Sequence, residues 1–384
     1  MKAPIYLDYA STTPLGEAAA EAMRPWLGER FGNPSSVHRR GREAQTAIGR
    51  ARKQVAAAIG ADASEIFFTS GGTESDNWAI LGTALGNRDR GNHIITTAIE
   101  HHAVLNPCRW LEKNGFDVTY LPVDGEGFVS PKQVREALTD RTVLISVMTA
   151  NNEIGTLEPV EEIGRIAREH RICFHTDAVQ AVGAIPIDVR SIGADLMSLS
   201  GHKLHGPQGI GALYIRTGVR IDPLLRGGAQ ERGLRAGTEN VAAIAGLGAA
   251  MAESVHALPE RSARVAALRD RLIRGVLENV PGSRLNGPRE KRLPGNASFS
   301  FENIEGEALL LRLDLAGFCC SSGSACTSGS QEPSHVLEAI GLDREAVGGS
   351  LRVTLGAETT EEEIEALLEA LPRTVAQLRQ LRGI

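Results

Sequence analysis

Residues 195–216 read DLMSLSGHKLHGPQGIGALYIR, a stretch in which two apolar runs flank a polar turn. The runs 195–200 and 211–216 have the length and apolar content of buried strands. The turn between them carries Lys203, one of only six lysines among the 41 basic residues of the chain. Arginine serves elsewhere as the generic positive charge, so a lysine kept in this apolar setting indicates a chemical use for its amine.

Other apolar runs precede this stretch and alternate with amphipathic segments. The predicted strands are 65–70, 93–97, 117–123, 142–150 and 172–178, and the predicted helices include 74–86, 131–140 and 159–170. Strands that are apolar throughout and alternate with helices predict an α/β fold with a mostly parallel sheet covered on both faces. We assign residues 15–258 to this large domain.

The pattern changes after residue 258. An arginine-rich helix at 259–279, a helix near 306–317 and a C-terminal helix predict a smaller α+β domain, residues 259–384. Thr360 and Glu363 have the spacing of a capping box at the start of the last helix. The strand predicted at 5–10 joins one of the two domains, and we assign residues 1–14 to the small one.

Composition excludes several classes of function. The chain has 384 residues, 42% of them hydrophobic, and a net charge of -6, which gives no electrostatic support for binding nucleic acid or an anionic membrane. The first residues do not resemble a signal peptide, and no apolar run is long enough to span a membrane. We therefore expect a cytoplasmic protein. Its five cysteines, an odd number, argue against a disulfide framework.

Polar residues follow the predicted strands, at the edge of a parallel sheet where ligands bind. Gly72, Thr73 and Glu74 open a helix whose N–H groups suit an anion, although they also suit an ordinary helix cap. His101 and His102 follow the next strand. Neighbouring residues at a helix start point in different directions, so at most one faces a site, and either alone would more often be a surface or capping histidine.

Two further strand ends carry groups that need partners. Asp177 ends an apolar strand and must find a cation, such as a protonated pyridine nitrogen, unless it is a helix cap. Asn152 follows another strand and could donate to a ring substituent. Burial lowers the pKa of a lysine, which makes Lys203 a competent amine for a Schiff base with an aldehyde. A phosphate cradle, a carboxylate, a lysine and a histidine together predict pyridoxal 5′-phosphate as cofactor.

The sequence resembles the NifS/IscS-type cysteine desulfurases, class V members of the fold-type-I pyridoxal-phosphate superfamily. The resemblance extends over nearly the whole chain and rests on YLDYASTT, FGNPSSVH, FTSGGTES, EHHAVL, NNEIG, HTDAVQ, SLSGHKLHGPQGIGALY, ERGLRAGT, SSGSACTSGSQEPSHVL and SLRVTLG, in that order. It implies a mostly parallel large domain, a homodimer with shared active sites, and L-cysteine as substrate.

The resemblance also implies roles for particular residues. Lys203 would hold the cofactor, Asp177 would pair with the ring nitrogen, and His101 would stack on the ring and act in proton transfer. Either Lys203 or His101 would remove the Cα proton of the substrate. The other implied cofactor contacts are Gln180 and Asn152 near the ring hydroxyl, Gly72, Thr73, Ser200, Gly201 and His202 at the phosphate, and Thr238 reaching over from the partner subunit. Arg352 would clamp the substrate carboxylate, with Asn33 assisting.

Residues 319–330, CCSSGSACTSGS, hold three cysteines in a Ser/Gly-rich stretch that predicts a loop. The family motif makes Cys326 the nucleophile that takes sulfur from cysteine as a persulfide, and a loop would let it reach both cofactor and surface. Cys319 and Cys320 are either small apolar residues at a strand end or a relay for the persulfide. Cys108 and Cys173 are expected in the core.

Alternatives stay open at this point. A class V aminotransferase would have no use for Cys326, whereas selenocysteine lyase activity could accompany desulfuration. A zinc or iron–sulfur scaffold built from Cys319, Cys320, Cys326 and His335 lacks the usual CxxC pairs and leaves Lys203 unexplained. A transient iron–sulfur contact through Cys326 is compatible with the enzyme. The sulfur acceptor, whether an iron–sulfur scaffold or another protein, is not apparent from the sequence.

Overall fold

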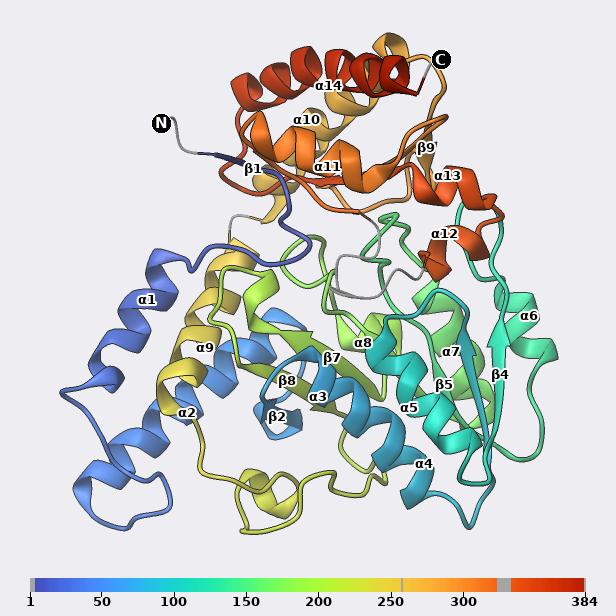
Figure 1. The fold of residues 1–384 in the computed structure, drawn as a ribbon. Helices are drawn as coiled ribbons and strands as arrows, with labels where there is room; N and C mark the ends of the chain where they lie inside the picture. The colour runs from blue at the N-terminus through green and yellow to red at the C-terminus, as the bar shows by residue number, and fades with distance from the viewer. Residues whose placement is uncertain (1–3, 257, 323–332, 383–384) are drawn as a thin grey trace.

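The protein is described here by a computed structural model covering residues 4–256, 258–322 and 333–382 (Figure 1). A seven-stranded sheet lies at its centre in the order β2-β8-β7-β6-β5-β3-β4. The strands are β2 (Ile66–Thr69), β3 (His93–Thr97), β4 (Asp117–Leu121), β5 (Thr142–Ser146), β6 (Cys173–Asp177), β7 (Leu196–Ser200) and β8 (Gly211–Ile215). Strand β8 runs in the opposite direction to the other six, which all point the same way, so the predicted mostly parallel sheet is confirmed.

Successive side chains of these strands enter different cores. Ile95 and Ile145 join one apolar cluster, whereas Ile94 and Leu144 join another. The first cluster is completed by α2 (Arg39–Ala58), α7 (Val160–His170) and α9 (Val241–His256), and the second by α4 (Thr83–Gly86) and α5 (His102–Glu112). Because helices bury both faces, the strands can be apolar throughout, as their sequences predicted.

The remaining helices of this part are short and connect the strands. They are α1 (Glu17–Met23), α3 (Gly72–Asn77), α6 (Pro131–Glu136) and α8 (Val189–Ile192), with a π-helical turn at Trp78–Gly82 joining α3 to α4. The helix predicted at 131–140 thus ends earlier, at Glu136. The strand predicted at 142–150 also ends early, at Ser146.

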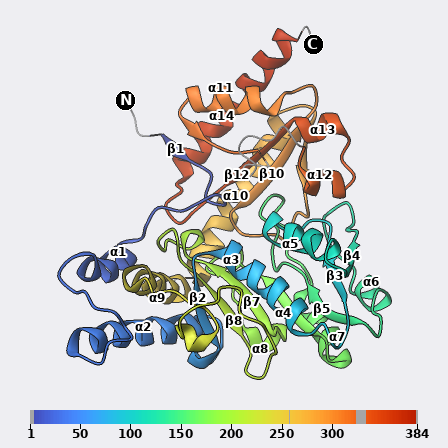
Figure 2. The same ribbon diagram turned by 60° about the horizontal axis from the view of Figure 1, so that its bottom comes forward.

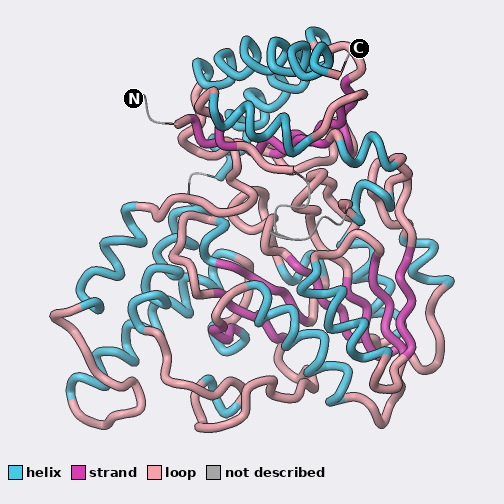
Figure 3. Tube along the Cα trace, in the orientation of Figure 1, coloured by secondary structure: helices cyan, strands magenta, loops and turns pink. Residues whose placement is uncertain are grey.

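A second, smaller sheet lies above the first in Figure 1. It contains β9 (Ser283–Asn286), β10 (Asn296–Phe301) and β12 (Ser350–Thr354), all antiparallel, and a separate parallel pair joins β1 (Ile5–Tyr6) to β11 (Phe318–Cys319). Its helices are α10 (Leu258–Asn279), α11 (Gly306–Leu315), α12 (His335–Ala339), α13 (Arg344–Gly348) and α14 (Glu361–Leu381). Figure 3 shows the strands in two separate layers.

The small sheet and its helices enclose their own apolar cluster, to which Leu7 contributes from the N-terminal segment. The N-terminal strand therefore pairs with the later part of the chain, as Figure 2 also shows. Cys319 ends strand β11, so the alternative that places it at a strand end is confirmed.

Among the described residues, no single helix is long and apolar enough to cross a membrane. The bent pair α9 and α10 meets the length and composition test only when both helices are taken together.

The predicted capping box at α14 is present. The Thr360 hydroxyl accepts the Glu363 N–H at 3.3 Å, and the Glu363 carboxylate accepts the Thr360 N–H at 3.0 Å. We expect Thr360→Ala to lower the free energy of unfolding by about 1 kcal/mol, because a helix-start N–H loses its acceptor. Urea denaturation of both proteins measures this. Glu369→Ala, on the exposed face of the same helix, is the control and should change stability by less than about 0.5 kcal/mol.

Candidate active site

The strand ends predicted to bind a ligand lie at one edge of the large sheet. Asp177 ends β6 and Ser200 ends β7, and a 3₁₀ turn, Gly201–Lys203, follows directly. Strand β2 is antiparallel to β8, which is itself antiparallel to β7, so β2 runs the same way as β7. Its end therefore brings the start of α3 to this edge as well.

Lys203 is held by a segment from the other end of the chain. Its Nζ donates to the carbonyl oxygens of Ala10 at 2.6 Å and Ser11 at 2.7 Å. Gln180 donates to the same Ala10 oxygen at 2.9 Å. The N-terminal segment thus orients the amine from one side. This contact was not predicted, because the segment was singled out only as the motif YLDYASTT.

The same segment holds Arg352. This residue lies on β12 with 1% of its surface exposed, and its Nη2 donates to Asp8 Oδ1 at 2.9 Å and to the Ser11 hydroxyl at 2.8 Å. Its Nη1 donates to the Asn152 carbonyl at 3.1 Å, and its buried Nε has no partner among the described residues. Ser11 therefore touches Lys203 through its carbonyl and Arg352 through its hydroxyl.

A pocket of about 400 Å³ lies beside these residues at the start of α3. The predicted phosphate ligands Gly72, Thr73, Ser200 and His202 all line it, and Ser11, Thr12 and Gln208 are further lining residues that the sequence did not single out. Gly201 is buried next to them. Glu74 also reaches this pocket, but Arg235 pairs with both of its oxygens, at 2.8 and 2.9 Å, which neutralises the one carboxylate there.

Asp177 is 6% exposed, and its Oδ1 accepts the Val179 N–H at 2.8 Å. Burial raises the pKa of this carboxyl, while the Val179 N–H and the charge of Lys203 oppose the shift. Asp76 on α3 is buried nearby. Burial, and then the negative charge of Asp177, raise its pKa well above the usual range.

The surroundings of Asp76 were not predicted from the sequence. His175 Nε2 lies 3.6 Å from Asp76 Oδ1, and burial lowers the pKa of His175 to about 3, so the ring is neutral. Its nitrogens contact the hydroxyls of Ser146 at 2.8 Å and Ser198 at 3.0 Å. Two features of the sequence could have indicated this pair: a carboxylate in the amphipathic segment ESDNWAIL and a histidine inside a buried strand.

The two adjacent histidines differ as expected. His101 caps α5, with Nδ1 accepting the Ala103 N–H at 3.1 Å. Burial and then the charge of Lys203 lower its pKa to about 4, so the imidazole is neutral. His102 instead faces His335, with ring centroids 4.7 Å apart.

Two predicted residues, Asn33 and Thr238, do not lie with the others within this chain. Asn33 is exposed on the loop before α2, and its Oδ1 accepts the Ser35 N–H at 2.9 Å. Thr238 is exposed on the loop before α9 and does not line the pocket at α3. Cys326 lies outside the described residues.

The chain on either side of the segment with Cys326 is anchored at the site. The backbone of Ser321 pairs with that of Arg352, with N–O distances of 2.7 and 3.2 Å. On the other side, the Ser334 hydroxyl donates to Glu153. Ser321 thus contacts Arg352 itself, and Ser334 contacts Glu153, a carboxyl on whose pKa the charge of Arg352 acts.

Cys319 ends β11 and Cys320 follows it directly, whereas Cys108 lies on α5 and Cys173 begins β6. Cys319 and Cys320 are half-buried, Cys320 against the apolar cluster of the small sheet, and burial raises the pKa of both thiols. Cys108 is fully buried as predicted, and Cys173 is half-buried at the start of β6. Within the described part of the chain, no three His, Cys, Asp or Glu side chains are placed to hold a metal ion.

These donors fit pyridoxal 5′-phosphate. They supply an amine, a buried carboxylate, a neutral imidazole, and hydroxyl and N–H donors around a pocket. Gly72 is required for this arrangement, because a Cβ there would lie 2.7 Å from Val179 Cγ2. Only glycine lets α3 begin against the loop that follows Asp177.

Comparison with known proteins agrees with this geometry. The family "Aminotransferase class-V" matches residues 5–367. A relative from Methanosarcina thermophila called "Cysteine desulfurase IscS" is 55% identical over 98% of this chain and 93% of its own. A solved "NIFS-LIKE PROTEIN" is 39% identical with a TM-score of 0.92, covering 97% and 100% of the two chains. A structure called "SspA in complex with cysteine" is 40% identical, with a TM-score of 0.82 and coverage of 93% and 100%.

The chain belongs to the class-V aminotransferase family and, within it, to the cysteine desulfurases. Enzymes of this family depend on pyridoxal phosphate, so the cofactor predicted from the strand ends is confirmed, as is the α/β fold.

Glu153 generates a prediction about pH. It is 5% exposed, and burial raises its pKa to about 7, although the Ser334 hydroxyl and Arg352 oppose this. The folded protein therefore holds a proton that the unfolded chain loses near pH 4.5. The contribution of this proton to the free energy of unfolding is therefore complete below pH 4.5, and it is lost as the pH rises to about 7. Glu153→Gln should remove this dependence, worth ~3 kcal/mol.

Urea denaturation at pH 5 and pH 8 measures the effect as the difference between variant and wild type. The stability of Glu153→Gln relative to wild type should increase from the lower to the higher pH. Glu278→Gln, exposed on α10, is the control and should give the same difference at both values. An unchanged difference for Glu153→Gln would show that burial does not raise its pKa.

Proposed function

We propose that the protein converts L-cysteine to L-alanine and transfers the sulfur to Cys326 as a persulfide. One observation carries the proposal: Ser11 and its neighbour Ala10 bind the Lys203 amine, while the Ser11 hydroxyl binds the Arg352 guanidinium. The amine that would hold the cofactor and the cation that would hold a carboxylate thus lie on either side of one residue. An α-amino acid substrate needs both.

Lys203 would hold the cofactor covalently, with Asp177 at the ring nitrogen, Gln180 and Asn152 near the ring hydroxyl, and His101 at the ring face. Gly72, Thr73, Ser200, Gly201 and His202 would bind the phosphate. When bound, pyridoxal phosphate supplies an electron sink that labilises the Cα proton and the bond to sulfur. The buried Asp177 would hold the ring nitrogen in place.

The hydrogen bond of His101 indicates which residue donates a proton and which residue removes one. Because Nδ1 accepts the Ala103 N–H, the neutral ring carries its proton on Nε2 and acts there as a donor. Lys203 is then the group that removes the Cα proton. The sequence left these two residues as alternatives for that role.

Arg352 would clamp the substrate carboxylate, exchanging its contact with Asp8 for one with the ligand. Cys326 follows Ser321 by five residues, a span of at most roughly 17 Å, so its thiol can reach substrate bound at Arg352. The Cys326 thiolate attacks the substrate sulfur, the carbon–sulfur bond breaks, and the carbon takes up a proton. Cysteine and a thiol thus give alanine and a persulfide, with all atoms accounted for.

We further propose a homodimer, in which the exposed Thr238 completes the phosphate pocket of the partner subunit. Residues 15–258 would form the cofactor-binding domain, and residues 259–384 with 1–14 the domain that carries Cys326. The persulfide would pass to an iron–sulfur scaffold or another sulfur acceptor, with at most a transient cluster contact at Cys326. A cytoplasmic location suits this chemistry because it keeps thiols reduced.

The role of Cys326 can be tested by comparing wild type with Cys326→Ala. Both proteins should show the same visible absorbance of bound cofactor, because the thiol does not hold it. Release of alanine and sulfide from L-cysteine with a reductant should fall at least ~100-fold in the variant, which lacks the nucleophile. Cys319→Ala and Cys320→Ala are the matched controls. If one of these loses activity and Cys326→Ala keeps it, the nucleophile is that cysteine.

The role of Arg352 can be tested with Arg352→Gln in an Asp8→Asn background, which avoids leaving an uncompensated carboxylate. Losing a charge-assisted clamp of about 3 kcal/mol should lower kcat/KM for L-cysteine about 100-fold. The cofactor spectrum should stay unchanged. Arg284→Gln, exposed on β9, is the control. Full activity in the double variant would mean that another group binds the carboxylate.

A further inference from the structure

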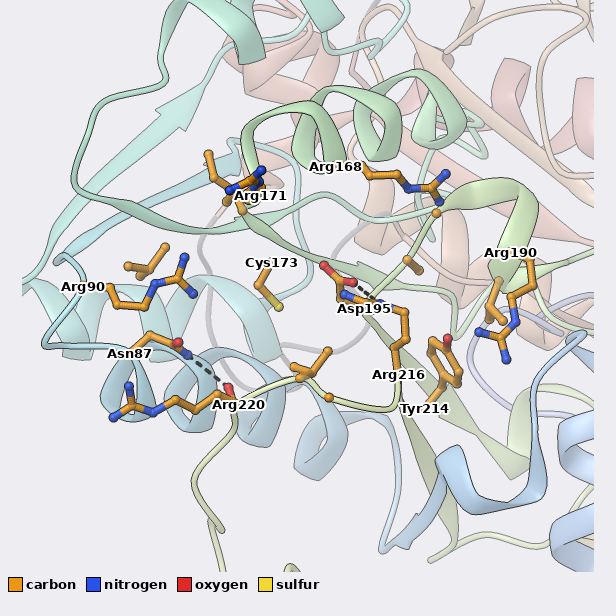
Figure 4. Close-up of a pocket in the computed structure, with 17 residues that line it drawn as sticks. Asn87, Arg90, Arg168, Arg171, Cys173, Arg190, Asp195, Tyr214, Arg216 and Arg220 are labelled. Atoms are coloured by element: carbon orange, nitrogen blue, oxygen red, sulfur yellow. Dashed lines mark hydrogen bonds and ion pairs between the residues drawn. The ribbon is translucent and has the colours of Figure 1, made fainter.

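A second pocket lies at the opposite edge of the large sheet, where β6 and β7 begin and β8 ends (Figure 4). Its volume is about 650 Å³, within the range of small-molecule sites. Six of its 17 lining residues are arginines, although the whole chain has a net charge of -6. These six arginines, the arginine ring, are Arg90, Arg168, Arg171, Arg190, Arg216 and Arg220.

Half of the arginine ring is neutralised by carboxylates. Arg190 pairs with Asp62 at 3.1 Å and Glu65 at 2.7 Å, Arg216 pairs with Asp195 at 2.6 Å, and Arg220 pairs with Asp89 at 2.9 Å.

The other half has no such compensation. No carboxylate of the residues that the structure describes lies within ion-pair distance of Arg90, Arg168 or Arg171. Figure 4 shows the six side chains spaced around Cys173 and Asp195. The pocket therefore carries about three positive charges that an anion would neutralise.

Tyr214 gives an independent indication of a ligand. It lines the pocket, is fully buried, and its hydroxyl has no hydrogen-bond partner among the described residues. Figure 4 shows this hydroxyl directed between Arg190 and Arg216. Burial raises the pKa of Tyr214 to about 12, so at neutral pH the group is a donor. Burying a donor without an acceptor costs free energy, which a bound oxyanion would recover.

Gly193 makes room for one of the arginines. It has a φ of +72°, and a Cβ at this position would lie 2.6 Å from Arg168 Nη2. The chain thus has a glycine where a side chain would displace the guanidinium from the pocket wall.

Simple stabilisation of a helix end explains only part of this cluster. Arg168 lies in the last turn of α7 and Arg171 is its C-cap, where cations interact favourably with the helix dipole. Arg90 comes from the turn after α4, and Tyr214 comes from β8, so neither serves that helix. Burial also keeps the Cys173 thiol protonated. The pocket offers donors without an ionised nucleophile, which suits binding rather than catalysis.

We propose that this pocket binds a small molecule carrying phosphate groups. The planar guanidinium groups match phosphate oxygens two at a time, and the Tyr214 hydroxyl supplies a donor deeper in the pocket. A concave site of this size accommodates a diphosphate and, with it, a nucleoside. The site is separate from the cofactor pocket, since it lies at the other end of the strands.

Calorimetric titration of the cofactor-loaded enzyme with pyrophosphate, at fixed ionic strength, tests the proposal. Wild type should show saturable binding at one site per chain in addition to any binding elsewhere. Arg90→Ala/Arg171→Ala should weaken it at least 10-fold, and Tyr214→Phe several-fold. The control Arg274→Ala/Arg289→Ala removes two exposed arginines outside the pocket and should leave the affinity unchanged. Desulfurase activity should be the same in all four proteins.

A competition with ADP identifies the source of the phosphate groups. If ADP displaces pyrophosphate, the ligand class is a nucleotide, and if only pyrophosphate binds, it is a free polyphosphate. No saturable binding by wild type below about 10 mM would overturn the proposal. Equal weakening in the pocket and control variants would overturn it as well, because the effect would then be one of net charge.

Discussion

The backbone from Asp8 to Thr13 is the connection on which the active site depends. Ala10 and Ser11 present their carbonyls to Lys203, and the Ser11 hydroxyl and Asp8 carboxylate bind Arg352. Lys203 follows β7 at the edge of the large sheet, whereas Arg352 lies on β12 of the small sheet. A short strand at the start of the chain, fixed against β11, therefore sets the separation between the two groups that would bind an amino acid substrate.

Charge inside the large sheet is controlled by burial more than by pairing. Asp76 and Asp177 lie close together. Burial raises the pKa of both carboxyls, and the charge of Asp177 raises the pKa of Asp76 further. His101 and His202 are kept neutral by burial and by the charge of Lys203. The interior thus holds a small number of charges next to Lys203, where a charged cofactor would bind.

Much of this arrangement could be predicted from the sequence. The strands of the large sheet were evident because each is apolar on both faces, and the ligands at their ends follow from the topology of parallel sheets. The contact of Ser11 with Lys203 could not be predicted, since it joins residues 192 positions apart through a backbone carbonyl that any residue carries. Asp76 was missed for a related reason: its pKa is raised by burial and then by the charge of Asp177, a neighbour only in the folded chain.

The pairing of Ser321 with Arg352 has a consequence for evolution. The chain that leads to Cys326 is fixed at Ser321 by the strand that carries Arg352, and again at Ser334 by Glu153. The number of residues between these two anchors can therefore change without loss of either contact.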